Sequence, residues 1–129
     1  MLLDTNIVGY FFRRDSRARL YVRHLVGQQR FISFTTQAEL YQWLFLRPFT
    51  VANRERLLAH IKRHVVLPHD ERMAWCWAEL TAHCRKQGIG ISTSDAWIAA
   101  TALRHDLPLI THNRKHFERV PGLTIISES

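Results

Sequence analysis

Four oxygen-bearing side chains occur where a strand-like run of the chain gives way to a helix or a turn. Asp4 comes directly after an apolar run at the N-terminus, and Glu39 lies in the first turn after a second such run. Asp95 opens an alanine-rich segment, and Asn113 follows a further apolar run. In open α/β sheets, ligands bind beyond the carboxyl ends of the strands. We therefore expect these four side chains to gather at one edge of a sheet.

Carboxylates that gather in this way favour a divalent metal ion. They repel one another, and a cation relieves the repulsion while the carboxylates stay ionised. Carboxylate and amide oxygens are hard ligands that suit Mg²⁺ or Mn²⁺, whereas a zinc site is expected to contain Cys and His. The sequence therefore predicts a Mg²⁺ or Mn²⁺ site at this edge of the sheet.

Each of these residues also has a structural explanation. Glu39 stands three residues after Thr36, which is the spacing of a helix capping box. Asp95 in a first helical turn would complement the helix dipole, and Asn113 would satisfy a turn. Asp4 is harder to explain in this way, because a carboxylate at the end of a buried strand needs a partner.

Strand-like and helix-like segments alternate along the chain. Alternation of strands with helices of about ten to fifteen residues indicates β-α-β units and a parallel sheet. The fold class expected is therefore α/β, with a mostly parallel central sheet flanked by helices on both faces, in one domain spanning residues 1–129. The predicted strands cover residues 1–3, 31–34, 65–67, 107–111 and 123–126, and the predicted helices cover 7–12, 36–46, 54–64, 70–88 and 95–103.

Composition supports one folded unit. A chain of 129 residues with 47% hydrophobic residues fits a single domain with a sizeable core. No apolar run approaches the roughly 20 residues that span a bilayer, so neither a membrane span nor a secretory signal is expected. Cys76 and Cys84 lie about 12 Å apart along a predicted helix, beyond disulfide reach. We therefore expect a cytoplasmic protein.

The charge balance points to an anionic partner. Eighteen Lys and Arg residues against eleven Asp and Glu residues give a formal net charge of +7. Such an excess suits a polyanion such as a nucleic acid, and the alternative is that it only aids solubility.

Four motifs, taken together, resemble those of PIN domains, especially the VapC-type toxins of bacterial toxin-antitoxin pairs. Their order and spacing match the family, and the resemblance spans the whole chain. The motifs are Leu2-Leu3-Asp4-Thr5-Asn6, Thr36-x-x-Glu39-Leu40, Ser94-Asp95-x-x-Ile98-Ala99-Ala100-Thr101-Ala102 and Ile110-Thr111-x-Asn113-x-x-His116-Phe117.

The resemblance implies a Mg²⁺- or Mn²⁺-dependent endoribonuclease that leaves a 5′-phosphate and a 3′-hydroxyl. Asp4, Glu39 and Asp95 take the positions of the family's three acidic residues and form the expected metal-binding set, with Asp4 and Asp95 as direct metal ligands. Asn113, at a polar position of the last motif, completes the expected catalytic set. Relatives often carry a further acid where this chain has His116, so a site with four carboxylates is not expected.

Residues next to these motifs are candidates for binding RNA. The expected substrate-binding set is Thr5, Asn6, Arg14, Arg114 and His116. Further candidates are Arg13, Arg17, Arg19 and Lys115 for phosphate and Tyr10, Phe12, Tyr41 and Trp43 for base stacking. The alternatives are a solvated helix face for the basic residues and a core or subunit interface for the aromatic ones. A zinc site on His60, His64 and His69 is a weaker hypothesis, because no acidic or cysteine partner completes it.

The resemblance also implies protein partners. Similar proteins form homodimers and are held inactive by a small antitoxin whose C-terminal segment covers the acidic pocket. Two other functions remain open: a PIN-fold module that binds RNA or protein without cutting, as the missing acid at His116 would allow, and a housekeeping RNA-processing nuclease.

Overall fold

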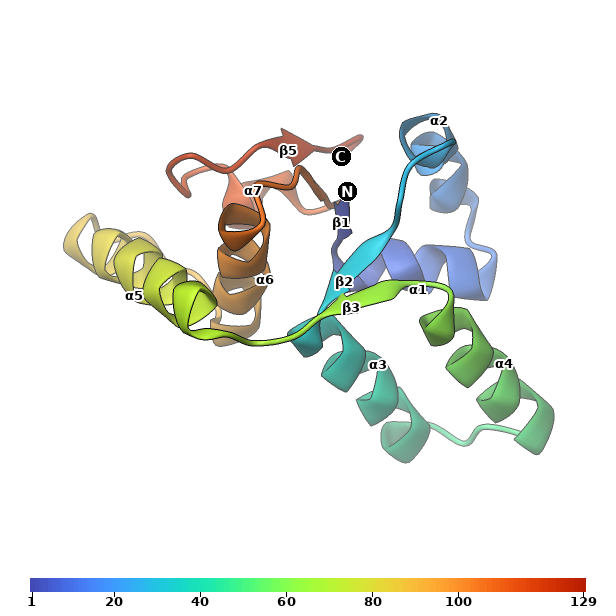
Figure 1. The fold of residues 1–129 in the computed structure, drawn as a ribbon. Coiled ribbons are helices and arrows are strands. Elements are labelled where there is room, and N and C mark those ends of the chain that lie inside the picture. Colours follow the sequence, from blue (N-terminus) through green and yellow to red (C-terminus); the bar gives the residue numbers. More distant parts are fainter.

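Five short parallel strands form the centre of the molecule, in the order β3-β2-β1-β4-β5 (Figure 1). The structure is a computed structural model that describes residues 1–129. The strands are β1 (Leu2–Leu3), β2 (Phe31–Ser33), β3 (Val65–Leu67), β4 (Leu109–Ile110) and β5 (Ile125–Ile126). The helices are α1 (Thr5–Arg13), the 3₁₀ helix η1 (Ser16–Tyr21), α2 (Val22–Leu25), α3 (Phe34–Leu46), α4 (Val51–Lys62), α5 (Glu71–Lys86), α6 (Thr93–Arg104) and α7 (Arg114–Phe117).

The strand order places β1 at a switch point of the sheet. From β1 the chain builds β2 and β3 on one side, and it returns to build β4 and β5 on the other. Leu2 of β1 is paired with Phe31 of β2 and with Leu109 of β4. In this topology a crevice opens beyond the carboxyl end of the central strand, where ligands bind.

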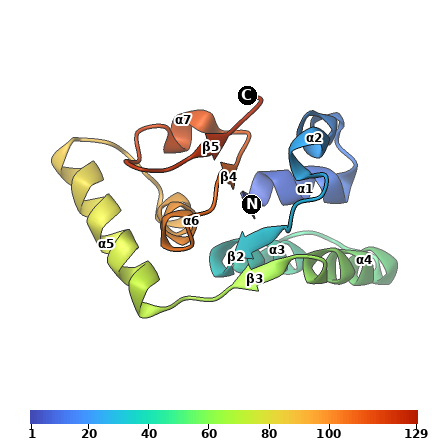
Figure 2. The same cartoon turned by 45° about the horizontal axis from the view of Figure 1, so that its top comes forward.

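Helices cover both faces of the sheet because side chains alternate along each strand. Leu3, Ile32 and Ile110 face a core built with α1, η1, α2, α3 and α4. Leu2 and Leu109 face a second core built with α5, α6 and α7. Figure 2 shows the two groups of helices on opposite sides of the strands. No helix combines the length and apolar character that crossing a membrane requires.

The α/β fold with helices on both faces is confirmed, and the sheet is parallel throughout. The predicted strand 107–111 is too long, because the Leu107 N–H bonds back to the Ala102 carbonyl at the end of α6. The last strand is also shorter than predicted. Helices η1, α2 and α7 were missed because they are short and lack an apolar period.

Serine caps set where the two helices next to the acids begin. Ser33 Oγ accepts a hydrogen bond of 3.0 Å from the Thr36 N–H, so α3 starts at Phe34. The capping box of Thr36 with Glu39 is therefore wrong, and Glu39 lies in the second turn of α3. Ser92 caps α6 in the same way through the Asp95 N–H.

Candidate active site

Asp4 lies at the carboxyl end of β1, where it caps helix α1 with 5% of its surface exposed. Its Oδ1 accepts a hydrogen bond of 2.7 Å from the Thr5 N–H, and its Oδ2 accepts one of 2.7 Å from the Thr111 hydroxyl. Burial, helped by the charges of Asp95 and Glu39 and opposed by the two hydrogen bonds, raises the pKa of Asp4 to about 6. Asp4 therefore shares one electrostatic environment with the two other acids.

Glu39 ties together three helices. Its Oε1 accepts hydrogen bonds of 2.9 Å from the hydroxyls of Thr5 on α1 and Ser94 on α6. The Thr5 hydroxyl also lies 3.0 Å from that of Thr36, one turn before Glu39 on α3. Two donors on one oxygen hold the carboxylate in place and leave its second oxygen, Oε2, without a hydrogen bond inside the protein.

Asp95 stands in the first turn of α6 and meets α7. Its Oδ2 accepts a hydrogen bond of 3.1 Å from Nδ1 of His116. The side chain of His116 is 56% exposed, whereas that of Asp95 is 18% exposed. His116 is thus in direct contact with an acid of this cluster.

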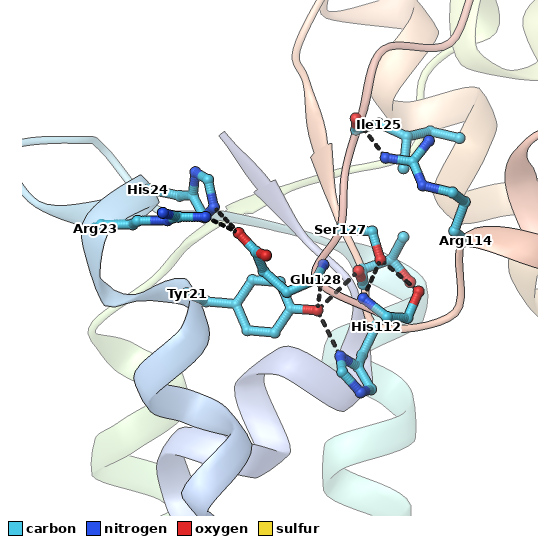
Figure 3. Close-up of polar contacts among 10 residues, drawn as sticks. Tyr21, Arg23, His24, His112, Arg114, Ile125, Ser127 and Glu128 are labelled. Atoms are coloured by element: carbon cyan, nitrogen blue, oxygen red, sulfur yellow. Dashed lines mark hydrogen bonds and ion pairs between the residues drawn. The ribbon is translucent and has the colours of Figure 1, made fainter.

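The loop after β4 is fixed from two sides. The Thr111 hydroxyl that donates to Asp4 also accepts a hydrogen bond of 3.0 Å from the Asn113 N–H. The next residue, His112, bonds through Nδ1 to the Tyr21 hydroxyl, which in turn accepts the Glu128 N–H at 3.0 Å (Figure 3). Burial raises the pKa of Tyr21, so this hydroxyl stays protonated at neutral pH. Asn113 is therefore held next to Asp4 through its backbone.

A pocket of about 590 Å³ opens beside Glu39. Glu39 and Ser94 line it together with Phe34 and Trp97, whose rings lie edge to face at 5.7 Å. The pocket therefore combines one acid of the cluster, Glu39, with aromatic walls.

Comparisons with known proteins show the family of this chain. A family model described as "PIN domain" matches residues 1–123. The chain belongs to the PIN domain family. Ribonuclease VapC1 of Haemophilus influenzae (strain R2866) is 32% identical to this PIN domain over 124 residues, which cover 95% of this chain and 92% of that protein. The resemblance to VapC proteins is thus confirmed.

Solved structures show the same fold. The VapBC-1 structure from nontypeable Haemophilus influenzae aligns with this PIN domain at a TM-score of 0.87 and 28% identity, covering 98% of this chain and 96% of that one. FitAcB from Neisseria gonorrhoeae aligns at a TM-score of 0.84 and 26% identity, over 98% and 96% of the two chains.

The substrate-binding candidates fall into different places in this PIN domain. Thr5 is buried against Glu39, and Asn6 is half-buried in the first turn of α1. Arg114 extends to the Ile125 carbonyl at 3.4 Å, along the edge of β5 (Figure 3). Arg14 follows α1, whose nine residues carry it about 14 Å from the carboxyl ends of the strands.

Several secondary candidates have structural roles instead. Tyr10 and Phe12 belong to the core, so base stacking on them is wrong. Arg17 pairs with Asp15 at 2.7 Å and lies over the Tyr10 ring. The zinc hypothesis is also wrong, because His69 packs against Phe34 and Trp97 and no group of three suitable ligands exists.

The hydroxyl groups of Ser94, Thr111 and Tyr21 were missed as functional residues, whereas Thr5 was predicted to bind substrate. Ser94 and Thr111 donate directly to Glu39 and Asp4, and Tyr21 anchors the loop after β4. A signal was present for Ser94, which stands immediately beside Asp95 in the sequence. Its bonding partner Glu39, however, lies far away along the chain.

The donor set of the PIN domain suits a hard cation. No group of three or more His, Cys, Asp or Glu side chains lies close enough together to hold an ion alone. Mg²⁺ commonly takes only one or two carboxylates and keeps several waters. Asp4, buried within the field of Asp95 and Glu39, is a carboxylate whose ionised form a cation would stabilise. The residues present therefore fit Mg²⁺ or Mn²⁺ bound by two carboxylates and water.

Removing the Thr5 hydroxyl is expected to leave the Glu39 carboxylate with the Ser94 hydrogen bond alone, and so less firmly oriented. We expect Thr5→Val to lower RNA cleavage about tenfold, because a charge-assisted hydrogen bond to the carboxylate is lost. Thr5→Ser keeps the hydroxyl and is expected to cleave at close to the wild-type rate. Single-turnover cleavage of labelled RNA is measured for both variants. Equal rates for Thr5→Val and Thr5→Ser would show that the Thr5 hydroxyl does not position Glu39.

Proposed function

We propose that this PIN domain is a Mg²⁺- or Mn²⁺-dependent endoribonuclease that acts as the toxin of a toxin-antitoxin pair. The observation that carries the proposal is the buried Asp4 at the carboxyl end of β1, whose pKa is raised by burial and by the charges of Asp95 and Glu39. Three acids kept in one field, at the switch point of a parallel sheet, have little structural benefit without a cation. The VapC relatives, which carry the name ribonuclease, support the same activity.

Each residue of the site has a role in this proposal. Asp4 and Asp95 hold the metal ion, and Glu39, fixed by Thr5 and Ser94, orients water at the site. Asn113 lies on the same loop as the Asp4 partner Thr111 and completes the polar rim. When bound, the ion supplies positive charge at the scissile phosphate and makes water a stronger nucleophile.

The surroundings suit a single-stranded RNA. The net charge of +7 attracts the phosphate backbone and speeds the encounter. The pocket beside Glu39 has aromatic walls from Phe34 and Trp97, and unpaired bases stack on such rings. The scissile phosphate would then lie over the acids with a neighbouring base in this pocket.

Protein partners are part of the proposal. The related VapBC and FitAcB structures support a small antitoxin as a partner of this chain. Phe45, Leu46 and Val51, at the turn between α3 and α4, are 82%, 69% and 75% exposed, and exposed apolar clusters mark protein interfaces. We propose that such surfaces serve the antitoxin and a second copy of the chain in a homodimer.

A second function, RNA or protein binding without cleavage, is favoured by one observation. His116 stands where relatives often have an acid, and its hydrogen bond engages Oδ2 of Asp95. Weakened metal binding at Asp95 would leave a PIN fold that binds RNA but does not cut it.

Expression in a bacterial host tests the toxin function. The wild-type chain alone is expected to arrest growth, and co-expression of the small open reading frame next to its gene is expected to relieve the arrest. Asp95→Asn, expressed to the same level, is the matched control and is expected to allow growth. RNA cleavage in vitro without growth arrest would indicate a housekeeping nuclease, and RNA binding without cleavage would indicate the binding module.

His116→Ala tests the contribution of the histidine. We expect metal-dependent cleavage to fall about tenfold, because Asp95 loses the hydrogen bond that orients it. Lys115→Ala, on the same exposed turn, is the control and is expected to change cleavage less. Full activity of both His116→Ala and Asn113→Ala would mean that neither residue acts in catalysis.

A further inference from the structure

A second polar pocket lies at the opposite ends of the strands from the acids. It has a volume of about 320 Å³. Arg30 and His64, which line it, directly precede β2 and β3, and the Val65 N–H bonds to the Arg30 carbonyl at 2.9 Å. The pocket is therefore at the amino ends of these strands, whereas Asp4 and Glu39 lie at the carboxyl ends.

Arginines dominate this pocket. Four of them converge on it: Arg14 after α1, Arg30 before β2, Arg56 on α4 and Arg63 after α4. None of the four forms an ion pair, since the ion pairs of the molecule use other cations. No carboxylate lines the pocket. Four guanidinium groups without a counter-charge repel one another, and an anion relieves that repulsion.

Two of the arginines are held in place by other contacts. Arg56 donates a hydrogen bond of 2.8 Å to the Phe12 carbonyl and lies 3.9 Å from the centre of the Phe12 ring. Arg30 lies 5.4 Å from the centre of the Phe11 ring. Such contacts reduce the entropy that the side chains lose when a ligand binds.

The pocket's arginine charges also act on its histidines. His60 donates from Nε2 to the Val8 carbonyl at 3.3 Å, and His64 donates from Nδ1 to the His60 carbonyl at 3.0 Å. Burial, together with the charges of His64, Arg63 and Arg56, lowers the pKa of His60 to about 4, and burial also lowers the pKa of His64. Both imidazoles are therefore neutral at pH 7, and the positive charge of the pocket comes from the arginines.

The conformation of Arg14 is a separate indication. It adopts φ 55° and ψ 38° at the end of α1, a left-handed conformation that favours Gly or Asn. An arginine at this position is a poor choice for the backbone, yet it adds a fourth guanidinium to the pocket. Residues held in sparsely populated backbone conformations cluster at active sites and ligand sites.

We propose that this pocket binds a phosphoryl group, at a site separate from the acidic cluster. One arginine fork satisfies both oxygens of a carboxylate, whereas a phosphate carries about two charges and more oxygens, and so uses several forks at once. The pocket's volume is at the lower end of the range for small-molecule sites, which fits a phosphate or a mononucleotide. The proposal is independent of the nuclease function, because it uses none of the acids.

Titration with inorganic phosphate tests the proposal directly. Wild-type protein is followed by NMR of the arginine Nε–H groups at pH 7.5, in EDTA and at constant ionic strength set with chloride. Saturable shifts at Arg30 and Arg63, with a dissociation constant of about 1 mM or tighter, are expected, while the exposed Arg119 stays unchanged. Equal shifts at Arg119, or no saturation, would overturn the site.

Matched variants distinguish phosphate binding in the pocket from nonspecific attraction of phosphate by the positive charge of the protein. Arg30→Gln and Arg63→Gln are each expected to weaken phosphate binding about tenfold, and Arg119→Gln, at an exposed position outside the pocket, is expected to leave it unchanged. Arg56 is not used, because it also bonds the Phe12 carbonyl. Thermal unfolding confirms that each variant is folded, and a variant that does not fold is replaced by Arg14→Gln. Folded variants that bind phosphate as wild type does would overturn the proposal.

Two further ligands identify the source of the phosphoryl group. A 5′-mononucleotide that competes with phosphate, where a short RNA with a 5′-hydroxyl does not, indicates a free phosphate monoester. Competition by that RNA indicates backbone phosphate. A glutamate-rich peptide that binds at least about tenfold more tightly than phosphate would overturn the phosphoryl assignment in favour of an acidic protein segment.

Discussion

Asp4→Asn is expected to stabilise the metal-free protein at pH 7.5. The pKa of Asp4 is raised to about 6 in the folded chain, chiefly by burial, so the folded state favours the neutral carboxyl. The stability that this preference contributes is present below pH 4 and is lost as the pH rises through about 6. At pH 7.5 the ionised Asp4 costs up to about 3 kcal/mol, and the asparagine avoids that cost.

Urea unfolding in EDTA at pH 7.5 and pH 4 measures this effect. The difference in unfolding free energy between Asp4→Asn and wild type is expected to be positive at pH 7.5 and to shrink toward zero at pH 4. Glu55→Gln, at an exposed position of α4, is the control and is expected to change little at either pH. A less stable Asp4→Asn protein at pH 7.5 would mean that the two hydrogen bonds to the carboxylate outweigh its burial.

The same unfolding experiment with added Mg²⁺ tests whether Asp4 binds the metal ion. Mg²⁺ that binds only the folded state raises stability by mass action. We expect added Mg²⁺ to stabilise wild type and not Asp4→Asn, so the stability gap between them narrows at pH 7.5. Equal stabilisation of both proteins would place the binding of Mg²⁺ elsewhere.

Asp95→Asn is expected to reduce RNA cleavage by a factor on the order of 10³, which corresponds to the several kcal/mol that a metal site supplies to the transition state. Unlike Asp4, Asp95 stands in a first helical turn at the edge of the site, where its neutralisation is expected to change stability little. The measurement is single-turnover cleavage at saturating Mg²⁺, with Glu118→Gln, at the exposed residue directly after α7, as the control. A loss of less than about tenfold would remove Asp95 from the metal ligands.

The position of the acids could be predicted from the sequence, because strand ends are a local feature. An apolar run that stops at Asp4 marks the end of a strand, and a parallel sheet brings such ends to one edge. The hydroxyl network could not be predicted in this way. Thr5 and Glu39 are 34 residues apart, and Thr111 and Asp4 are 107 apart, so only the packing of helices and the pairing of β1 with β4 reveal these bonds.

The location of Arg14 in the fold could not be predicted from its place in the sequence. Arg14 follows the first motif closely in the sequence, which predicted a contact with the substrate, but the nine-residue helix α1 separates the two in space. It lines a pocket with Arg30 and Arg63, which come from loops before β2 and β3. Nearness along a chain predicts nearness in space only within one turn of a helix or one strand.

The most direct test of metal-dependent hydrolysis is to determine the ends of the RNA products. Purified wild-type protein is incubated with defined single-stranded RNA in Mg²⁺, in Mn²⁺ and in EDTA, beside Asp4→Asn purified in the same way. Attack by water at the acidic site predicts cleavage only with metal, only by wild type, and with 5′-phosphate and 3′-hydroxyl ends. Cleavage in EDTA, or products with 2′,3′-cyclic phosphate and 5′-hydroxyl ends, would contradict a metal-dependent active site at Asp4, Glu39 and Asp95.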